Sequence, residues 1–285
     1  MRRAYNLLRP QPWYRREAFS RGLRVAGYEV IEDRVEPARP GDVLLIWNRY
    51  GGRHEQALAF EHAGGTTLVA ENGYIGAGGS EPKFDVHPGG PQPHHYYALA
   101  KHYHHGRGEW FSGGPERFSA LGLELKPWRT EGDHILICPN RSFGVPPQVM
   151  PKDWAERTAA RVRQQTERPV RIRRHPGNDA PARRIGEDLR NAWAVVVWSS
   201  NVGVQALVAG IPVICMAPFW ICKNATQPYL STVEDRPNEA LRQIEDGIRF
   251  DSMTRLAWAQ WRLDEIEQGT PFDHLLSTTR ESALA

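Results

Sequence analysis

Four polar turns, each directly after an apolar run, carry the residue types that proton transfer and anion binding require. They occupy residues 71–73 (ENG), 140–144 (NRSFG), 173–176 (RRHP) and 199–201 (SSN). In open α/β sheets, ligands bind beyond the carboxyl ends of the strands, so polar residues at these points are the best site candidates. We therefore expect the chemistry of this protein to lie at these four turns.

The turn at 173–176 favours a phosphate ligand. Arg173 and Arg174 offer guanidinium forks and His175 offers an imidazole donor to phosphate oxygens, while Pro176 ends the strand. Because side chains alternate along a strand, one of the two arginines points away from the other. The alternative is a loop histidine without a role, but the neighbouring serine turn favours phosphate binding.

Ser199 and Ser200 end the next apolar strand, where a helix is expected to begin near Asn201. The first N–H groups of that helix lack backbone acceptors and attract an anion. The alternative is that the two serines only cap the helix. Together with the basic turn on the adjoining strand, the serine turn predicts a phosphate site.

The turn at 140–144 occupies the position of a loop that approaches a phosphate. Arg141 adds positive charge there, and Gly144 lets the backbone come close to the ligand. The motifs GxGxxG and GxxxxGK[ST] are absent, so the sequence predicts neither a classical dinucleotide site nor a P-loop.

Glu71 is the candidate base, because a carboxylate at the end of a strand could take a proton from a hydroxyl nucleophile. The alternative is a carboxylate that caps the next turn or pairs with an arginine.

Histidines at 94, 95, 102, 104 and 105 could form a metal cluster, but no HExxH spacing or paired acidic ligand accompanies them. The mixture of imidazoles, aromatic rings and basic residues favours a surface that recognises a sugar-like or planar acceptor. The acceptor-binding residues that we expect are Asn48, Arg49, His102, His104, His105 and Arg107.

Composition restricts the class of protein. The chain has 285 residues, of which 40% are hydrophobic, so it can bury a sizeable core. No apolar run approaches the roughly 20 residues of a membrane span, and no secretory core follows the first residues, so we expect a soluble cytoplasmic protein without membrane partners. Three cysteines suit buried thiols better than a disulfide framework or a zinc cluster, and 36 basic against 33 acidic residues predict a surface of mixed sign.

Apolar runs alternate with amphipathic segments twice along the chain, which predicts two parallel sheets with helical crossovers. We expect an α/β protein of two Rossmann-like domains that face each other across a cleft, with a C-terminal helix packing back near the domain junction. That helix should be capped by Asp251 or Ser252, and a long loop with one short helix near 96–105 should fill residues 76–114. The expected domains are an acceptor domain (1–128), a nucleotide-sugar domain (129–250) and the C-terminal helix and tail (251–285), with a linker at 126–133.

The turns at 71–73, 175–176 and 199–200 together resemble the GT-B glycosyltransferases of the bacterial sialyltransferase and capsular Kdo-transferase type. The resemblance implies that Glu71 is the base, that His175 contacts the donor phosphate and assists its departure, and that Ser199 and Ser200 hold that phosphate. The family has two acidic residues before the glycine where this sequence has Glu71 and Asn72. The flanking arginines leave open a nucleoside diphosphate as the donor.

Longer stretches, such as GDVLLIWNRYGG and VRIRRHPGNDAP, resemble proteins encoded by phages and prophages. Because phages commonly glycosylate hydroxymethylated pyrimidines in their DNA, this resemblance implies a DNA acceptor, whose target base would have to flip out of the duplex. A surface polysaccharide is the alternative acceptor.

The sequence therefore predicts a glycosyltransferase that moves a sugar from a nucleotide-sugar donor to a hydroxyl acceptor. No divalent metal or other cofactor is needed in this scheme, because no DxD-like acidic pair marks a metal-diphosphate clamp. The alternatives are a non-catalytic nucleotide- or nucleic-acid-binding module and a sugar-nucleotide epimerase or hydrolase.

Overall fold

The computed structural model describes residues 1–75, 96–175, 185–227 and 244–277. The chain forms two compact units. Unit 1 comprises Met1–Tyr74, Pro91–Gly113 and Ala257–Ala285, and unit 2 comprises Ile75–Gly90 and Gly114–Leu256. Within the described ranges, every helix is too short or too polar to span a bilayer.

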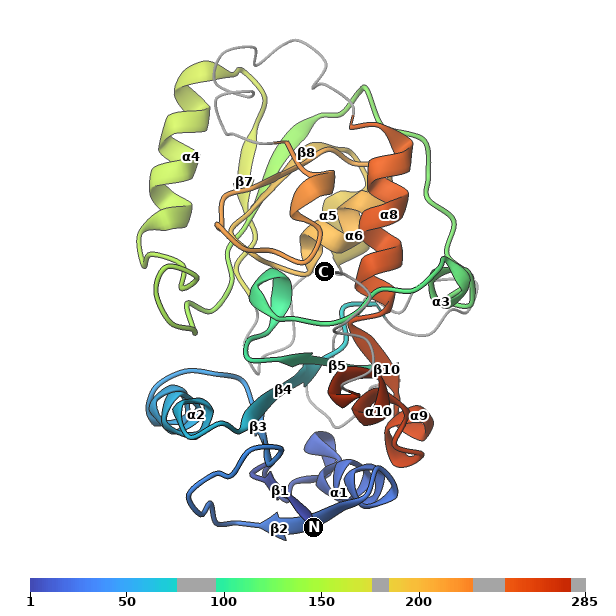
Figure 1. The fold of residues 1–285 in the computed structure, drawn as a ribbon. Coiled ribbons are helices and arrows are strands. Elements are labelled where there is room, and N and C mark those ends of the chain that lie inside the picture. The colour runs from blue at the N-terminus through green and yellow to red at the C-terminus, as the bar shows by residue number, and fades with distance from the viewer. Residues whose placement is uncertain (76–95, 176–184, 228–243, 278–285) are drawn as a thin grey trace. The chain divides into compact units, whose positions relative to one another are not determined.

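Unit 1 is built on a six-stranded sheet in the order β10-β5-β4-β3-β1-β2 (Figure 1). Four strands, β1 to β4, run parallel, whereas β5 pairs antiparallel with β4 and β10 pairs antiparallel with β5. The strands are β1 (Arg2–Asn6), β2 (Tyr28–Glu32), β3 (Val43–Trp47), β4 (Thr66–Asn72), β5 (Tyr96–Lys101) and β10 (Gln260–Arg262).

Helices cover both faces of this sheet. On one side lies α2 (Gly52–His62), whose Ala57 and Phe60 pack on the apolar side chains of β1, β3 and β4. On the other side lie α1 (Arg16–Val25), α9 (Leu263–Glu267) and α10 (Thr270–Leu276) (Figure 1). A Cβ at Gly22 of α1 would lie 1.8 Å from the Ile266 carbonyl oxygen, so α1 and α9 can pack this closely only around a glycine. Helices α9 and α10, at the end of the described chain, are thereby part of the core of unit 1.

Unit 2 contains a four-stranded, fully parallel sheet in the order β7-β6-β8-β9. The strands are β6 (His134–Cys138), β7 (Val170–Ile172), β8 (Ala192–Val197) and β9 (Val213–Cys215). Helix α4 (Trp154–Gln165) lies on one side of the sheet, and α5 (Ile185–Leu189), α6 (Val202–Val208) and α8 (Asp246–Ala257) lie on the other (Figure 1). Short helices α3 (Glu116–Ser119), η1 (Pro12–Tyr14), η2 (His105–Arg107) and η3 (Lys223–Ala225) complete the described elements.

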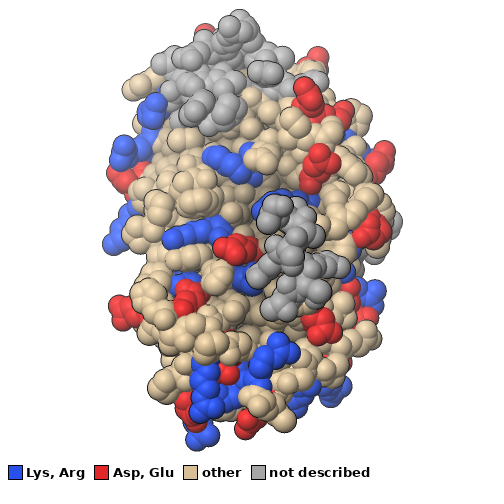
Figure 2. All heavy atoms as spheres, viewed as in Figure 1, with Lys and Arg blue, Asp and Glu red and all other residues tan. Residues whose placement is uncertain are grey.

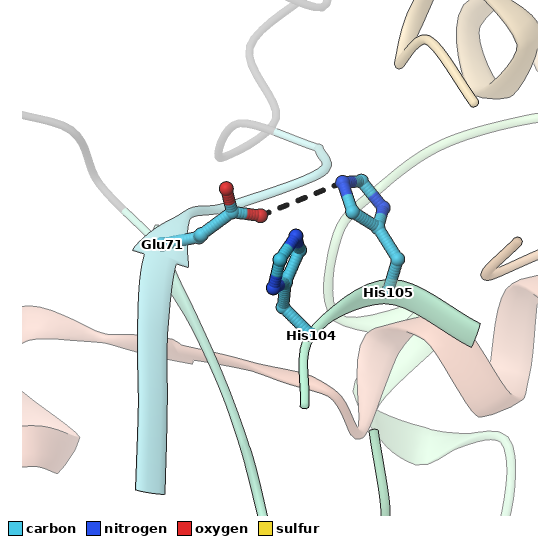
Figure 3. Close-up of side chains that lie close together, drawn as sticks. All are labelled: Glu71, His104 and His105. Atoms are coloured by element: carbon cyan, nitrogen blue, oxygen red, sulfur yellow. Dashed lines mark ion pairs between the residues drawn. The ribbon is translucent and has the colours of Figure 1, made fainter. Parts of the chain in front are cut away.

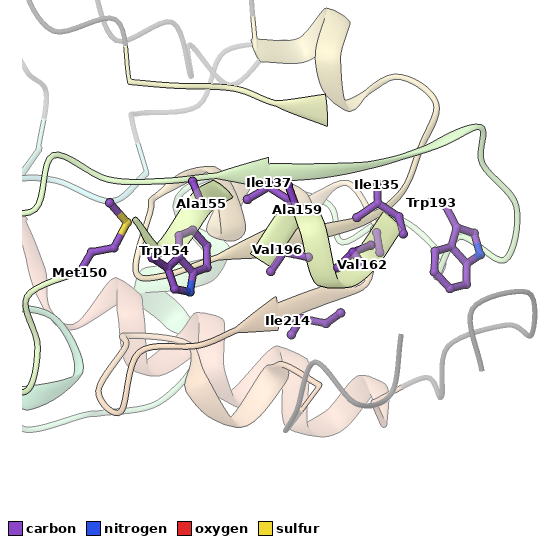
Figure 4. Packing of buried hydrophobic residues seen from close by; sticks show 11 residues of the cluster. Ile135, Ile137, Met150, Trp154, Ala155, Ala159, Val162, Trp193, Val196 and Ile214 are labelled. Carbon is purple, nitrogen blue, oxygen red and sulfur yellow. The ribbon is translucent and has the colours of Figure 1, made fainter. Parts of the chain in front are cut away.

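The packing of unit 2 explains why strand β8 is an unbroken apolar run. Ala194 of β8 belongs to the same cluster as Trp154 of α4, and Val196 lies beside residues of that helix (Figure 4). On the other face, a Cβ at Gly203 of α6 would lie 3.3 Å from Val197 Cγ2. Alternate residues of β8 thus face helices on opposite sides, and all six are buried. Burial on both faces is what a parallel sheet with helical crossovers requires.

The structure confirms the mixed α/β class and the strands and helices expected in both halves. It corrects the short helix expected near 96–105, because Tyr96–Lys101 is strand β5, buried between β4 and β10. Pairing on both edges outweighs the helix preference of its alanines and leucine. The loop expected at 76–95 lies outside the described residues.

The C-terminal expectation is also corrected. Helix α8 begins at Asp246, so Asp251 and Ser252 lie inside it and do not cap it. The chain then forms β10, α9 and α10, which places Trp261 on a strand. Residues 126–133, expected as a linker, are anchored in unit 2, where the N–H groups of Lys126 and Arg129 donate to the carbonyls of Val208 and Gly210.

Candidate functional site

Unit 1 brings Glu71, His104 and His105 together (Figure 3). Glu71 lies on β4 where this strand pairs with β5, and the two histidines lie on the loop that follows β5. His105 Nε2 lies 3.4 Å from Glu71 Oε2, and the imidazole centroids of the two histidines are 5.3 Å apart. All three side chains are partly buried. Glu71, the candidate base, therefore lies beside two imidazoles.

The loop that carries the histidines is fixed at several points. Lys101 and Glu109 exchange backbone hydrogen bonds across its base, and the N–H of His105 donates to the Tyr74 hydroxyl at 3.2 Å. A Cβ at Gly108 would lie 2.5 Å from the Tyr103 carbonyl oxygen, so the loop can close only around a glycine. These contacts hold both imidazoles beside the carboxylate of Glu71.

His105 is neutral at physiological pH. Burial lowers the pKa of His105 to about 4, and the nearby His104 acts in the same direction, while Glu71 opposes both. A neutral imidazole has one nitrogen with a free lone pair, so His105 can accept a hydrogen bond or bind a metal ion.

Arg49, expected in acceptor binding, is 1% exposed and is engaged by its own unit. Its guanidinium donates to both carboxylate oxygens of Glu61 at 2.7 and 2.8 Å and to the His102 carbonyl oxygen at 2.5 Å. It also lies 4.2 Å from the centre of the Tyr103 ring. Because its guanidinium hydrogen-bonds to groups of unit 1, Arg49 stabilises the loop that carries His102, His104 and His105.

Glu61 is the centre of this buried network, because His102 Nδ1 also lies 3.0 Å from Glu61 Oε1. Burial alone would raise the pKa of Glu61, but the hydrogen bonds from His102 and Arg49 outweigh it and lower the pKa to about 2. Glu61 was not among the residues expected from the sequence. The spacing of 12 residues between Arg49 and Glu61 gives no signal of their pairing, which depends on how α2 packs.

The two other expected acceptor residues lie at different places in unit 1. The guanidinium of Arg107 stacks on the Tyr103 ring at 3.6 Å from its centre. Asn48 adopts a left-handed backbone with φ 60°, and its side-chain oxygen is buried without a hydrogen-bond partner among the described residues. Arg107 thus belongs to the same aromatic cluster as Arg49, whereas Asn48 follows β3.

In unit 2, the expected phosphate-binding turns all follow the carboxyl ends of parallel strands. Asn140 Nδ2, after β6, donates to Ser199 Oγ, after β8, at 3.0 Å, so two of the turns meet. Ser200 Oγ accepts from the N–H of Val202 at 3.3 Å, but the N-cap residue of α6 is Asn201, whose side chain makes no capping hydrogen bond. The side-chain oxygens of Asn140 and Asn201 are buried and have no hydrogen-bond partner within the described ranges.

The basic residues after β7 are close to acidic partners. Arg173 Nε lies 2.8 Å from an oxygen of Asp188, and Arg174 pairs with Glu156 of α4. The exposed fraction is 16% for the side chain of Arg173 and 68% for that of Arg174, so the expected alternation in their directions is confirmed. Neither acidic partner could be predicted from the sequence, because Glu156 and Asp188 lie on helices α4 and α5.

His175 lies in a positive environment, although Pro176 is outside the described residues. Desolvation lowers the pKa of His175, and the positive charges of Arg141 and Arg173 lower it further. Arg141 stacks loosely on Phe143, and Gly144 has φ 138°, a backbone conformation that favours glycine. Arg141 and Arg173 are thus both close enough to His175 to lower its pKa.

The surface carries charges of both signs. Figure 2 shows Lys and Arg interspersed with Asp and Glu over the face in view. This agrees with the near balance of 36 basic and 33 acidic residues.

Two solved structures are similar to this chain over nearly its whole length. One is the β-Kdo 2,7-transferase of KpsC from Thermosulfurimonas dismutans, with a TM-score of 0.53, 14% identity, and coverage of 95% of this chain and 99% of that chain. The other is the β-Kdo 2,4-transferase of the same protein, with a TM-score of 0.55, 12% identity, and coverage of 96% and 98%. No protein-family profile and no curated protein matches the sequence. The chain has a GT-B-like two-domain fold.

Proposed function

We propose that this protein is a glycosyltransferase that moves a sugar from a nucleotide-sugar donor to a hydroxyl of a glycan. The observation that carries the proposal is the similarity of the whole fold to two structures named as Kdo transferases. Because fold alone does not determine function, the residues of the candidate site must supply the chemistry.

Unit 2 is the proposed donor unit. Arg141, Arg173 and His175 supply positive charge or donors for a phosphate, and Ser199 and Ser200 supply hydroxyl groups. Preorganised donors of this kind stabilise the negative charge that develops on a departing phosphate. The buried side-chain oxygens of Asn140 and Asn201 are acceptors suited to ribose hydroxyls or to a base amino group.

Unit 1 is the proposed acceptor unit, with Glu71 as the base. The carboxylate is partly buried beside two imidazoles, which suits a group that takes a proton from a hydroxyl. His104, His105, Arg107 and Tyr103 supply imidazole, guanidinium and aromatic groups suited to a sugar. No metal ion enters this scheme.

For the acceptor, a glycan is favoured over hydroxymethylated DNA. The two similar structures carry names of sugar transferases, and no comparison supports a DNA acceptor. The face in Figure 2 mixes both signs of charge, whereas proteins that hold duplex DNA commonly show a basic stripe.

The first test is a thermal-shift panel with CMP, UDP, GDP and ADP on the unmodified chain, on His175→Ala and on His62→Ala. His62 is an exposed histidine of α2 and serves as the matched control. A nucleotide at a hundredfold excess over its dissociation constant adds about 2.7 kcal/mol of stability. We expect one nucleotide to raise the Tm of the unmodified chain and of His62→Ala, and to raise that of His175→Ala much less.

The nucleotide selected by the panel then defines the sugar donor for transfer assays, with CMP-Kdo as the first choice if CMP is selected. Products on oligosaccharides and on hydroxymethylated DNA are separated by mass spectrometry. Glu71→Gln should reduce turnover by about a hundredfold or more while the nucleotide still raises the Tm. No Tm increase with any nucleotide would refute the donor assignment, and transfer to DNA alone would refute the glycan acceptor.

A further inference from the structure

The geometry points to a transition-metal site formed by Glu71, His104 and His105, and we propose that it binds a divalent ion of the Zn²⁺ class. One ligand atom from each residue lies within 4.8 Å of the other two (Figure 3). Two imidazoles and one carboxylate are a donor set that suits zinc and neighbouring metals, whereas Mg²⁺ and Ca²⁺ prefer oxygen ligands alone.

The separation of the best-defined pair agrees with this assignment. With bonds of about 2.0–2.2 Å and tetrahedral angles, two ligand atoms of one Zn²⁺ stand about 3.4 Å apart. His105 Nε2 and Glu71 Oε2 are 3.4 Å apart, which is longer than a good hydrogen bond. A single ion between these atoms would therefore have ordinary bond lengths to both.

The backbone of the loop lets two sequential histidines reach the same carboxylate. His104 is extended, with φ −117° and ψ 174°, so the next side chain of a regular strand would point to the opposite face. His105 instead has φ 52°, a left-handed conformation that non-glycine residues rarely adopt. This change of direction places both imidazoles beside Glu71, as Figure 3 shows.

The burial of the three ligands favours binding over a solvated surface cluster. The exposed fraction is 15% for the side chain of His105 and 22% for that of Glu71. The hydrogen bond from the His105 N–H to Tyr74 and the close contact at Gly108 fix the loop before any ligand arrives.

Three protein ligands leave at least one coordination position for water or another molecule, which is the arrangement of an open rather than a purely structural metal site. The proposal goes beyond the transferase assignment, because metal binding requires neither donor nor acceptor. When a metal is bound, the carboxylate of Glu71 is a ligand and not a free base. Excess Zn²⁺ is therefore expected to slow a transfer that depends on that base.

The test is titration of the full, metal-free chain with Zn²⁺ by calorimetry and with Co²⁺ by visible absorption. We expect one equivalent to bind and the Co²⁺ complex to show the d–d bands of a low-coordinate site with nitrogen ligands. His104→Ala, His105→Asn and Glu71→Gln should each weaken binding by more than about a hundredfold, since loss of an outer-shell partner alone costs up to about that much. His62→Ala should bind like the unmodified chain.

The variants are chosen so that weaker metal binding can be distinguished from misfolding. Asparagine adopts the left-handed conformation of position 105 more readily than most residues, and glutamine keeps the shape of Glu71. Circular dichroism and metal-free thermal melting check each variant. Failure of the unmodified chain to bind one equivalent, or equal binding by the folded double variant of His104→Ala and His105→Asn, would overturn the proposal. Neither outcome depends on nucleotide binding, so this proposal and the transferase assignment fail independently.

Discussion

The candidate residues of the two units are held in different ways. In unit 1, Glu71, His104 and His105 form one tight group that is supported by the buried pair of Arg49 and Glu61. In unit 2, the candidate residues lie on three separate turns at the carboxyl edge of a parallel sheet. The ion pairs there range from mostly buried, for Arg173 with Asp188, to exposed, for Arg174 with Glu156.

The two units position their candidate side chains by different means. The turns of unit 2 are brought together by the topology of the sheet, which any sequence with this strand order would share. The group in unit 1 depends on individual side-chain contacts, because its loop is closed by particular hydrogen bonds and by a glycine. Single substitutions should therefore disturb unit 1 more than unit 2.

The largest effect is expected for Arg49→Met. The change removes one partner of a buried pair and leaves the carboxylate of Glu61, 17% exposed, without its guanidinium. We expect a loss of about 3 kcal/mol in the free energy of unfolding, measured by urea denaturation. Arg174→Met in unit 2, whose pair with Glu156 is exposed, should cost less than about 1 kcal/mol. Equal losses in the two variants would contradict the comparison.

The second-largest effect is expected on acidification, which should lower the stability contributed by Glu61 in unit 1 more than that contributed by Glu156 in unit 2. The pKa of Glu61 is lowered from the ordinary value of 4.5 to about 2, so its contribution to stability is complete above 4.5 and is lost as the pH falls toward 2. The urea midpoint of the unmodified chain should therefore drop through this range, and that of Glu61→Gln should drop less. Glu156→Gln, at an exposed pair, is the control and should follow the unmodified chain.

Gly73→Ala should have a smaller but clear effect on unit 1. A Cβ at position 73 would lie 2.7 Å from Tyr96 Cβ and 2.8 Å from the Tyr96 carbonyl oxygen, so β4 and β5 would have to separate beside Glu71. We expect a loss of about 2 kcal/mol in the free energy of unfolding. Gly52→Ala, where a Cβ would meet nothing within 4 Å, is the matched control. A melting temperature for Gly73→Ala equal to that of the control would argue against the packing described here.

The smallest effect is expected for Ser199→Ala in unit 2. The change removes the hydroxyl that accepts the hydrogen bond from Asn140, so stability should fall by about 1 kcal/mol in thermal or urea melts. If this turn also holds a donor phosphate, the Tm increase given by the selected nucleotide should shrink as well. An undiminished nucleotide effect would remove Ser199 from the proposed donor site.

Much of the fold could be predicted from the sequence, because hydrophobic patterning is local. The apolar runs expected before the turns at 71–73, 140–144 and 199–201 are strands β4, β6 and β8, and helices lie between the successive strands of unit 2. Tyr96–Lys101 was misassigned since its residues fit a helix, and only its two neighbouring strands select the extended form. The expected start of α8 is six or seven residues late, because Asp246 and Asp251 can both stand at the beginning of a helix.

For the site, the sequence by itself determined the residue types and their places after strands. Glu71, His175 and Ser199 could be selected because the end of an apolar run is visible in one dimension. The tertiary structure alone decided which side chains meet: Glu71 with His105, Arg49 with Glu61, and Asn140 with Ser199. These partners are separated by 12 to 59 residues, and their distances are set by packing and loop closure, which no local pattern of residues encodes.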